Sequence, residues 1–185
     1  SLTYLTIKPE LTLKQMKLHA RHQFEDGTVL HWWHPISETG LPTKMVDDLL
    51  WLPFVLVHYL WETGDYSALD SKEPYYDNAK LEEGLYQHSV RAIEKVFTRF
   101  SDRGLPLIGA GDWNDGLSAV GLDMKGESVW MAEFFYFILT RFAPVARKRG
   151  EAAFASKLET KAVELKKAFD LHAWDGEYYF RGTKD

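Results

Sequence analysis

LLWLPFVLVHYL, residues 49–60, is apolar around its whole circumference when it is read as a helix. A helix of this kind is buried on every side. We expect it to start with Asp47 or Asp48 as its N-cap and to end at about Thr63, where Gly64 closes it. It is too short to cross a bilayer, which needs ~20 apolar residues. The stretch therefore predicts an inner helix of a helical protein.

The segment from about Ser128 to Ala143 is also apolar all round, and Pro144 is expected to kink or end it. Three further helices are predicted to be amphipathic or half-exposed: one over about 12–24, one from Leu85 toward Phe100, and one over 151–169. A short strand or extended segment is expected over 28–33, before Pro35. This alternation predicts an all-α fold, with inner helices wrapped by outer ones and a site in the loops at one end.

The composition narrows the class of protein. The chain has 185 residues, enough for one domain or part of a larger one, and 15% of them are aromatic. The net charge is −5 and the basic residues are scattered, which argues against a nucleic-acid groove. There is no cysteine, so disulfides and thiolate metal sites are excluded. The first ten residues do not form a signal peptide, and we expect a cytoplasmic protein with no membrane partner.

The motif GAGDWNDG, residues 109–116, lies in a long glycine-rich connection over 101–124. Asp, Asn and Trp bind the hydroxyls and the apolar face of a sugar, and glycines let the backbone approach a ligand. If the loop is partly buried, Asp112 and Asp115 cannot ionise independently, and one of them is expected to be a proton donor with a raised pKa. The alternative is a surface turn. A calcium loop is rejected because its glycine would stand one position later.

Other candidates have competing explanations. HWWHP, residues 31–35, could supply metal ligands, but no third ligand is spaced to complete a site, so we predict no metal and assign Trp33 and His34 to the lining of a sugar cleft. Of Asp47 and Asp48, one is expected to cap the helix and the other to be free for ligand. The segment that contains Glu127 either caps the next helix or contacts substrate.

Three segments together resemble glycoside hydrolase family 94, the inverting β-glucoside phosphorylases. They are GDWNDGL (111–117) followed by Val120-Gly121 and GESVW (126–130), then HWWHP with DDLLWLP (47–53), and finally WDGEYY (174–179). The second group is most similar to the branch of cyclic β-1,2-glucan synthases and 1,2-β-oligoglucan phosphorylases. The resemblance implies a fragment, residues 1–185, of one (α/α)6-barrel catalytic domain whose N- and C-terminal parts lie outside this sequence.

The resemblance also implies site residues. Asp115 matches the general acid, which protonates the glycosidic oxygen while inorganic phosphate attacks the anomeric carbon and releases α-glucose 1-phosphate. One carboxylate suffices, because phosphate is already an anionic nucleophile, and no other cofactor is implied. Trp113, Asp48 and, less directly, Asp47 match residues that bind the donor glucose. The supporting residues of this site are Asp112, Asn114 and Glu127.

Lys44 stands where the family carries an arginine that binds the donor sugar, and a lysine offers a point charge instead of a planar fork. The family's phosphate-binding residues lie beyond Asp185. We therefore expect the 185-residue chain by itself to be inactive and to associate with itself or with the rest of the barrel. Two alternatives stay open, a hydrolase with its catalytic base elsewhere and a carbohydrate-binding protein without catalysis.

Overall fold

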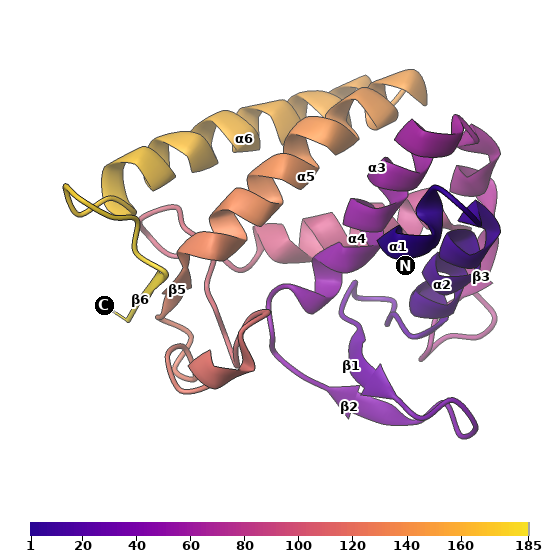
Figure 1. Ribbon diagram of the computed structural model, residues 1–185, viewed down its shortest axis with the longest axis horizontal. Helices are drawn as coiled ribbons and strands as arrows, with labels where there is room; N and C mark the ends of the chain where they lie inside the picture. Colours follow the sequence, from indigo (N-terminus) through magenta and orange to yellow (C-terminus); the bar gives the residue numbers. More distant parts are fainter. Residues whose placement is uncertain (185) are drawn as a thin grey trace. The chain divides into compact units, whose positions relative to one another are not determined.

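The computed structural model describes residues 1–184, which divide into two compact units. Unit 1 comprises Ser1–Thr43 and Asp48–Lys95, and unit 2 comprises Lys44–Asp47 with the chain from Val96 onward. Helices dominate both units, and the strands of the described residues are two to four residues long (Figure 1). The expected helical fold is confirmed, while the closed α/α barrel remains a prediction.

Unit 1 is built on helices that pack around a buried one. Its helices are α1 (Leu2–Leu5), α2 (Pro9–Arg21), α3 (Trp51–Thr63) and α4 (Leu85–Phe97) up to Lys95, with the short 3-10 helices η1 (Asp48–Leu50) and η2 (Tyr66–Asp70). Two antiparallel hairpins complete it: β1 (Leu30–Trp33) with β2 (Gly40–Pro42), and β3 (Lys72–Pro74) with β4 (Glu82–Gly84). The polar stretch over 67–83 thus contains regular structure.

Helix α3 confirms the inner helix, because every residue from 49 to 60 is buried or half-buried. Gly64 ends it in the left-handed region, at φ 67°, as the sequence predicts. The N-cap prediction is wrong: the helix begins at Trp51 after η1, and its N-cap residue is Leu50, which makes no side-chain capping bond. The carboxylate of Asp48 instead bonds with His31 and Thr43.

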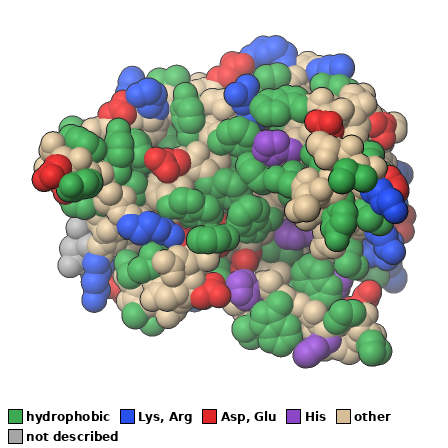
Figure 2. Space-filling model, in the orientation of Figure 1, with side chains coloured by type: hydrophobic (Ala, Val, Ile, Leu, Met, Phe, Trp, Pro, Cys, Tyr) green, Lys and Arg blue, Asp and Glu red, His purple; other side chains and the backbone are tan. Residues whose placement is uncertain are grey.

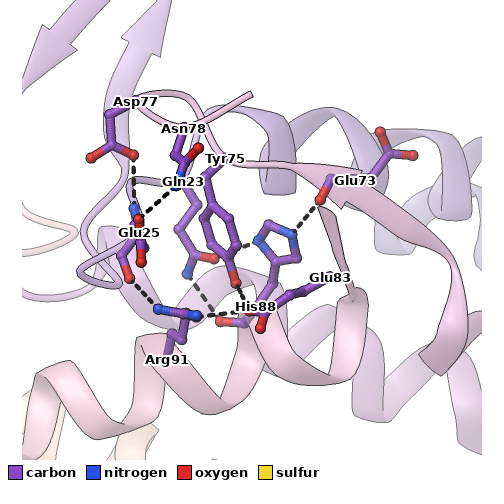
Figure 3. Close-up of polar contacts among 9 residues, drawn as sticks. All are labelled: Gln23, Glu25, Glu73, Tyr75, Asp77, Asn78, Glu83, His88 and Arg91. Atoms are coloured by element: carbon purple, nitrogen blue, oxygen red, sulfur yellow. Dashed lines mark hydrogen bonds and ion pairs between the residues drawn. The ribbon is translucent and has the colours of Figure 1, made fainter. Parts of the chain in front are cut away.

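A polar cluster ties the segment that follows α2, and α4, to the β3–β4 hairpin of unit 1 (Figure 3). His88 is fully buried, with Nδ1 2.6 Å from Gln23 Oε1 and Nε2 3.0 Å from the carbonyl oxygen of Glu73. The ring of Tyr75 stacks on it, and the Tyr75 hydroxyl donates to Glu83, which also accepts from Arg91. Burial lowers the pKa of His88. The polar groups of these side chains form hydrogen bonds within the cluster, so we assign it a role in stabilising the fold.

Unit 2 is organised by a helical hairpin. Helix α5 (Val129–Lys148) and helix α6 (Ala152–His172) lie side by side along most of their length (Figure 1). Strand β5 (Glu127–Ser128) lies directly before α5 and pairs antiparallel with β6 (Gly182–Thr183), which follows α6. The short 3-10 helix η3 (Asp115–Leu117) lies in the connection before β5. Unit 2 therefore brings the chain near Thr183 to the start of α5.

Two expectations for α5 are corrected. Pro144 lies inside the helix, which continues to Lys148, so the alternative that Pro144 ends the helix is wrong, while a kink at Pro144 stays a prediction. The apolar circumference is also not buried all round, since Glu133 and Tyr136 are exposed on one face. Among the described residues, α5 alone is long and apolar enough to cross a membrane, and 56% of that window is buried in the protein, as in a core helix.

Charged side chains are mixed on the surface. On the face drawn in Figure 2, Lys and Arg alternate with Asp and Glu, and hydrophobic side chains reach the surface between them. This distribution agrees with the scattered charges of the sequence and offers no basic stripe on that face.

Candidate functional site

The DWND loop (residues 109–116) is paired with the segment Lys44–Asp47. The amide of Ala110 donates to the carbonyl oxygen of Lys44 at 3.3 Å, and the amide of Val46 donates to that of Gly111 at 3.2 Å. Gly109 has φ 62°, and a Cβ there would lie 2.2 Å from the Lys44 carbonyl oxygen, so only glycine fits. The two segments that carry the predicted site of unit 2 therefore form one assembly.

Asp112 is the anchor of this loop. Its carboxylate is fully buried and accepts two bonds from the guanidinium of Arg181, at 2.6 and 2.8 Å, and one from Ser128 Oγ at 2.5 Å. Its Oδ1 also accepts the backbone N–H of Asn114 at 3.0 Å. Burial by itself would raise the pKa of Asp112, but the bonds from Arg181, Ser128 and Asn114 outweigh it and hold the pKa below its ordinary value.

Asp112 is therefore excluded as the proton donor, and the expectation that either aspartate of the motif could have a raised pKa is wrong for this one. A carboxylate with four donors is stabilised in its ionised form and has no proton to give. Its role is to hold the loop, which agrees with the supporting role that the resemblance implies.

Asp115 has the opposite environment. It opens η3, is exposed to solvent, and within residues 1–184 its carboxylate makes no hydrogen bond. The backbone beside it is fixed, because Asn114 Oδ1 accepts the N–H of Gly116 at 3.0 Å. The loop thus presents one free carboxylate on an anchored backbone.

An aromatic group lies beside this carboxylate in the chain. Trp113 is 68% exposed, and its ring centroid is 6.4 Å from that of Trp130, which in turn stacks on Phe134 at 5.2 Å. An exposed indole next to a carboxylate is the combination that packs on the apolar face of a sugar ring.

Glu127 and Ser128 connect the loop to α5. Ser128 caps the helix, since its Oγ accepts the N–H of Met131 at 3.0 Å, and this confirms the capping alternative. Glu127 is buried. Its carboxylate accepts hydrogen bonds from Nε and Nη2 of Arg103 and from Thr183 Oγ1, the last at 2.6 Å. Burial opposes ionisation of Glu127, yet Arg103 and the hydroxyls bound to it lower its pKa below the ordinary value.

The two buried carboxylates predict acid-sensitive stability. Because the folded pKa values of Asp112 and Glu127 lie below the ordinary 3.8 and 4.5, their stabilisation is complete above those values and is lost as the pH falls through the folded values. The free energy of unfolding, measured by denaturant titration at a series of pH values, should fall below about pH 4.5. Asp112→Asn should flatten this slope, and an unchanged slope in that variant would contradict the assignment.

The other predicted residues of unit 2 are placed differently. Asp47 is buried, with only 4% of its surface exposed, whereas Lys44 is exposed and contributes its carbonyl oxygen to the DWND loop. Both residues belong to the segment 44–47, which is hydrogen-bonded to the DWND loop.

In unit 1, Asp48 belongs to a second polar group. Its carboxylate accepts from Thr43 Oγ1 at 2.8 Å and lies 2.9 Å from His31 Nδ1. Trp33 is half-buried and stacks on His22 with 4.0 Å between ring centroids, so much of its surface is used in packing. His34 is exposed at the β1–β2 hairpin, edge-on to Trp32.

Four partners of the candidate site's carboxylates were not predicted from the sequence. Arg181 and Arg103 are partners of the buried carboxylates, and His31 and Thr43 are partners of Asp48. Arg181 is 69 positions from Asp112, so no local pattern could have linked them. Over residues 1–184, no three His, Asp or Glu side chains gather as metal ligands.

Comparisons with known proteins agree with the family resemblance. The family model of the glycosyl hydrolase 94 superfamily catalytic domain matches residues 1–185. The chain is 36% identical to a cyclic β-(1,2)-glucan synthase of Rhizobium meliloti over 100% of its own length and 7% of that protein. It is 32% identical to a solabiose phosphorylase of Paenibacillus borealis, over 96% of the chain and 22% of that protein.

A cellobionic acid phosphorylase of Neurospora crassa is 37% identical over 75% of the chain and 17% of that protein. The chain therefore spans less than a quarter of the length of each of these relatives.

Proposed function

The chain belongs to the glycosyl hydrolase 94 superfamily, and we propose that it supplies the general acid and part of the donor-sugar site of an inverting β-glucoside phosphorylase. Disaccharide phosphorylases are among its relatives, which makes a glycosyl-transferring enzyme the coarse assignment. The substrate we propose is a β-linked glucoside or glucan, and the product is α-glucose 1-phosphate.

One observation carries the proposal: of the two carboxylates of the DWND loop, Asp112 is saturated by donors and Asp115 is exposed and unbonded within the described residues. An inverting hydrolase needs two working carboxylates, an acid and a base that activates water. A phosphorylase needs only the acid, because its nucleophile is an anion. The loop supports the second arrangement.

The proposed reaction is a single displacement. Asp115 donates its proton to the glycosidic oxygen as that bond breaks, and a phosphate oxygen forms a bond to the anomeric carbon from the opposite face. Trp113 packs on the sugar beside the acid. In unit 2, Asp47 and Lys44 are proposed to bind donor hydroxyls, with Asn114 supporting the loop and Glu127 supporting the start of α5. In unit 1, Asp48, Trp33 and His34 are each proposed to contact sugar, on the family resemblance alone. No cofactor other than inorganic phosphate is proposed, nor is a nucleic-acid or membrane partner, and the proposed location is the cytoplasm.

Product analysis tests this proposal. The intact protein is incubated with β-linked glucose oligomers with and without inorganic phosphate, and glucose 1-phosphate and free sugar are quantified. We expect glucose 1-phosphate in the α configuration only when phosphate is present. Release of free glucose that does not depend on phosphate would favour a hydrolase, and binding without any product would favour a carbohydrate-binding protein.

A further inference from the structure

Arg181 makes a two-pronged contact with the anchor of the DWND loop. Its Nη2 donates to Asp112 Oδ1 at 2.6 Å and its Nη1 donates to Asp112 Oδ2 at 2.8 Å, while the carboxylate is completely buried and the arginine side chain is 39% exposed. A planar fork of this kind fixes the orientation of the carboxylate as well as its charge.

The contact continues by hydrogen bonds to the proposed acid. Asp112 Oδ1, which Arg181 holds, accepts the backbone N–H of Asn114, and Asn114 Oδ1 accepts the N–H of Gly116. Asp115 lies between these two anchored amides. A shift of the Asp112 carboxylate would therefore move the backbone on which Asp115 is carried.

Arg181 also reaches the aromatic side of the loop. Its guanidinium carbon lies 5.6 Å from the ring centroid of Trp130, the ring that neighbours Trp113 at 6.4 Å. Ser128 completes the arrangement, since its Oγ donates to Asp112 and accepts from the first turn of α5. The Arg181 side chain thus contacts both Asp112, the anchor of the loop, and the ring of Trp130.

We propose that Arg181 is the positioning residue of the general acid: it acts through Asp112 to hold Asp115 at the glycosidic oxygen. This inference rests on the proposed phosphorylase function. A positioning role predicts a loss that depends on the leaving group, because only substrates whose leaving group needs a proton require the acid to be in place.

The test uses Arg181→Met and Arg181→Lys in the intact protein. Two donors are compared with inorganic phosphate as the nucleophile, an unactivated β-linked glucose dimer and β-glucosyl fluoride, whose leaving group needs no proton. Arg181→Met should lower kcat on the dimer by ~10- to 100-fold with KM within a few-fold, and change turnover of the fluoride by less than about 3-fold. Arg181→Lys, which keeps the charge and loses the fork, should fall between wild type and Arg181→Met.

Arg103→Met is the matched control. Arg103 binds a buried carboxylate, that of Glu127 in β5, and its side chain is 37% exposed. Within residues 1–184 its hydrogen bonds go to Ser101, Glu127 and Thr183, and none goes to Asp112. Its removal leaves a buried carboxylate uncompensated, as that of Arg181 does, and should therefore destabilise unit 2 without selectivity between the two donors. Thermal unfolding of every variant shows how much of each loss is due to the fold.

The outcomes separate the two proposals. A loss confined to the dimer in both Arg181 variants supports the inference. Equal losses on both donors, or donor selectivity in Arg103→Met of the same size, would overturn it while leaving the phosphorylase function intact. A wild-type protein that forms no glucose 1-phosphate would overturn the proposed function, and this inference with it.

Discussion

Replacing Asp115 by asparagine should reduce phosphorolysis of unactivated β-glucosides by at least ~10²-fold, the usual contribution of a positioned general acid. Asparagine keeps the size and polarity of the side chain but has no acidic proton, and Asp115 makes no hydrogen bond within the described residues that the change would break. Sugar affinity should stay within a few-fold. Steady-state release of glucose 1-phosphate, with KM determined for each donor, measures both quantities.

The chain offers a matched control for this variant. Asp123 is another exposed aspartate of the same connection, and it accepts the backbone N–H of Lys125 as an ordinary turn residue. Asp123→Asn should leave phosphorolysis nearly unchanged. Near-normal turnover of Asp115→Asn, or an equal loss of that variant on β-glucosyl fluoride, would show that Asp115 is not the acid.

The helices were predictable because their signals are local. Burial of residues 49–60 follows from an apolar circumference, and the end of α3 follows from Gly64, whose missing Cβ permits φ 67°. The start of α3 was not predictable from Asp47 and Asp48. An acidic residue before an apolar run predicts an N-cap, but here His31 and Thr43 compete for the Asp48 carboxylate, and they come from the β1–β2 region.

The site was predictable in its motif and not in its electrostatics. GDWNDG predicted the position of the loop, and it is the basis on which Asp115 is proposed as the acid. The protonation behaviour of Asp112 depends on Arg181, which is distant in the sequence and is brought to the loop by the β5–β6 ladder. Burial by itself would raise the pKa of Asp112, as expected for a partly buried aspartate, but the bonds from Arg181, Ser128 and Asn114 together hold the pKa below its ordinary value.

The other large effect concerns the glycine that joins the loop to its neighbouring segment. Gly109→Ala should destabilise unit 2 by about 2–5 kcal/mol, the sum of a left-handed backbone in a residue with a Cβ, ~1–2 kcal/mol, and of overpacking, ~1–3 kcal/mol. At φ 62° the new Cβ would meet the carbonyl oxygen of Lys44 at 2.2 Å, and a backbone atom cannot move aside as the end of a side chain can.

Gly150→Ala separates these two contributions. Gly150 has φ 84° between α5 and α6, and a Cβ there meets nothing within 4 Å, so its substitution costs only the backbone term of ~1–2 kcal/mol. The difference between the two unfolding free energies, obtained by denaturant titration of the intact protein, isolates the clash with Lys44. Equal values would mean that the segment 44–47 does not pair with the DWND loop. A larger loss for Gly109→Ala, together with a fall in phosphorolysis that exceeds the unfolded fraction, would tie the donor-binding segment to the placement of the acid.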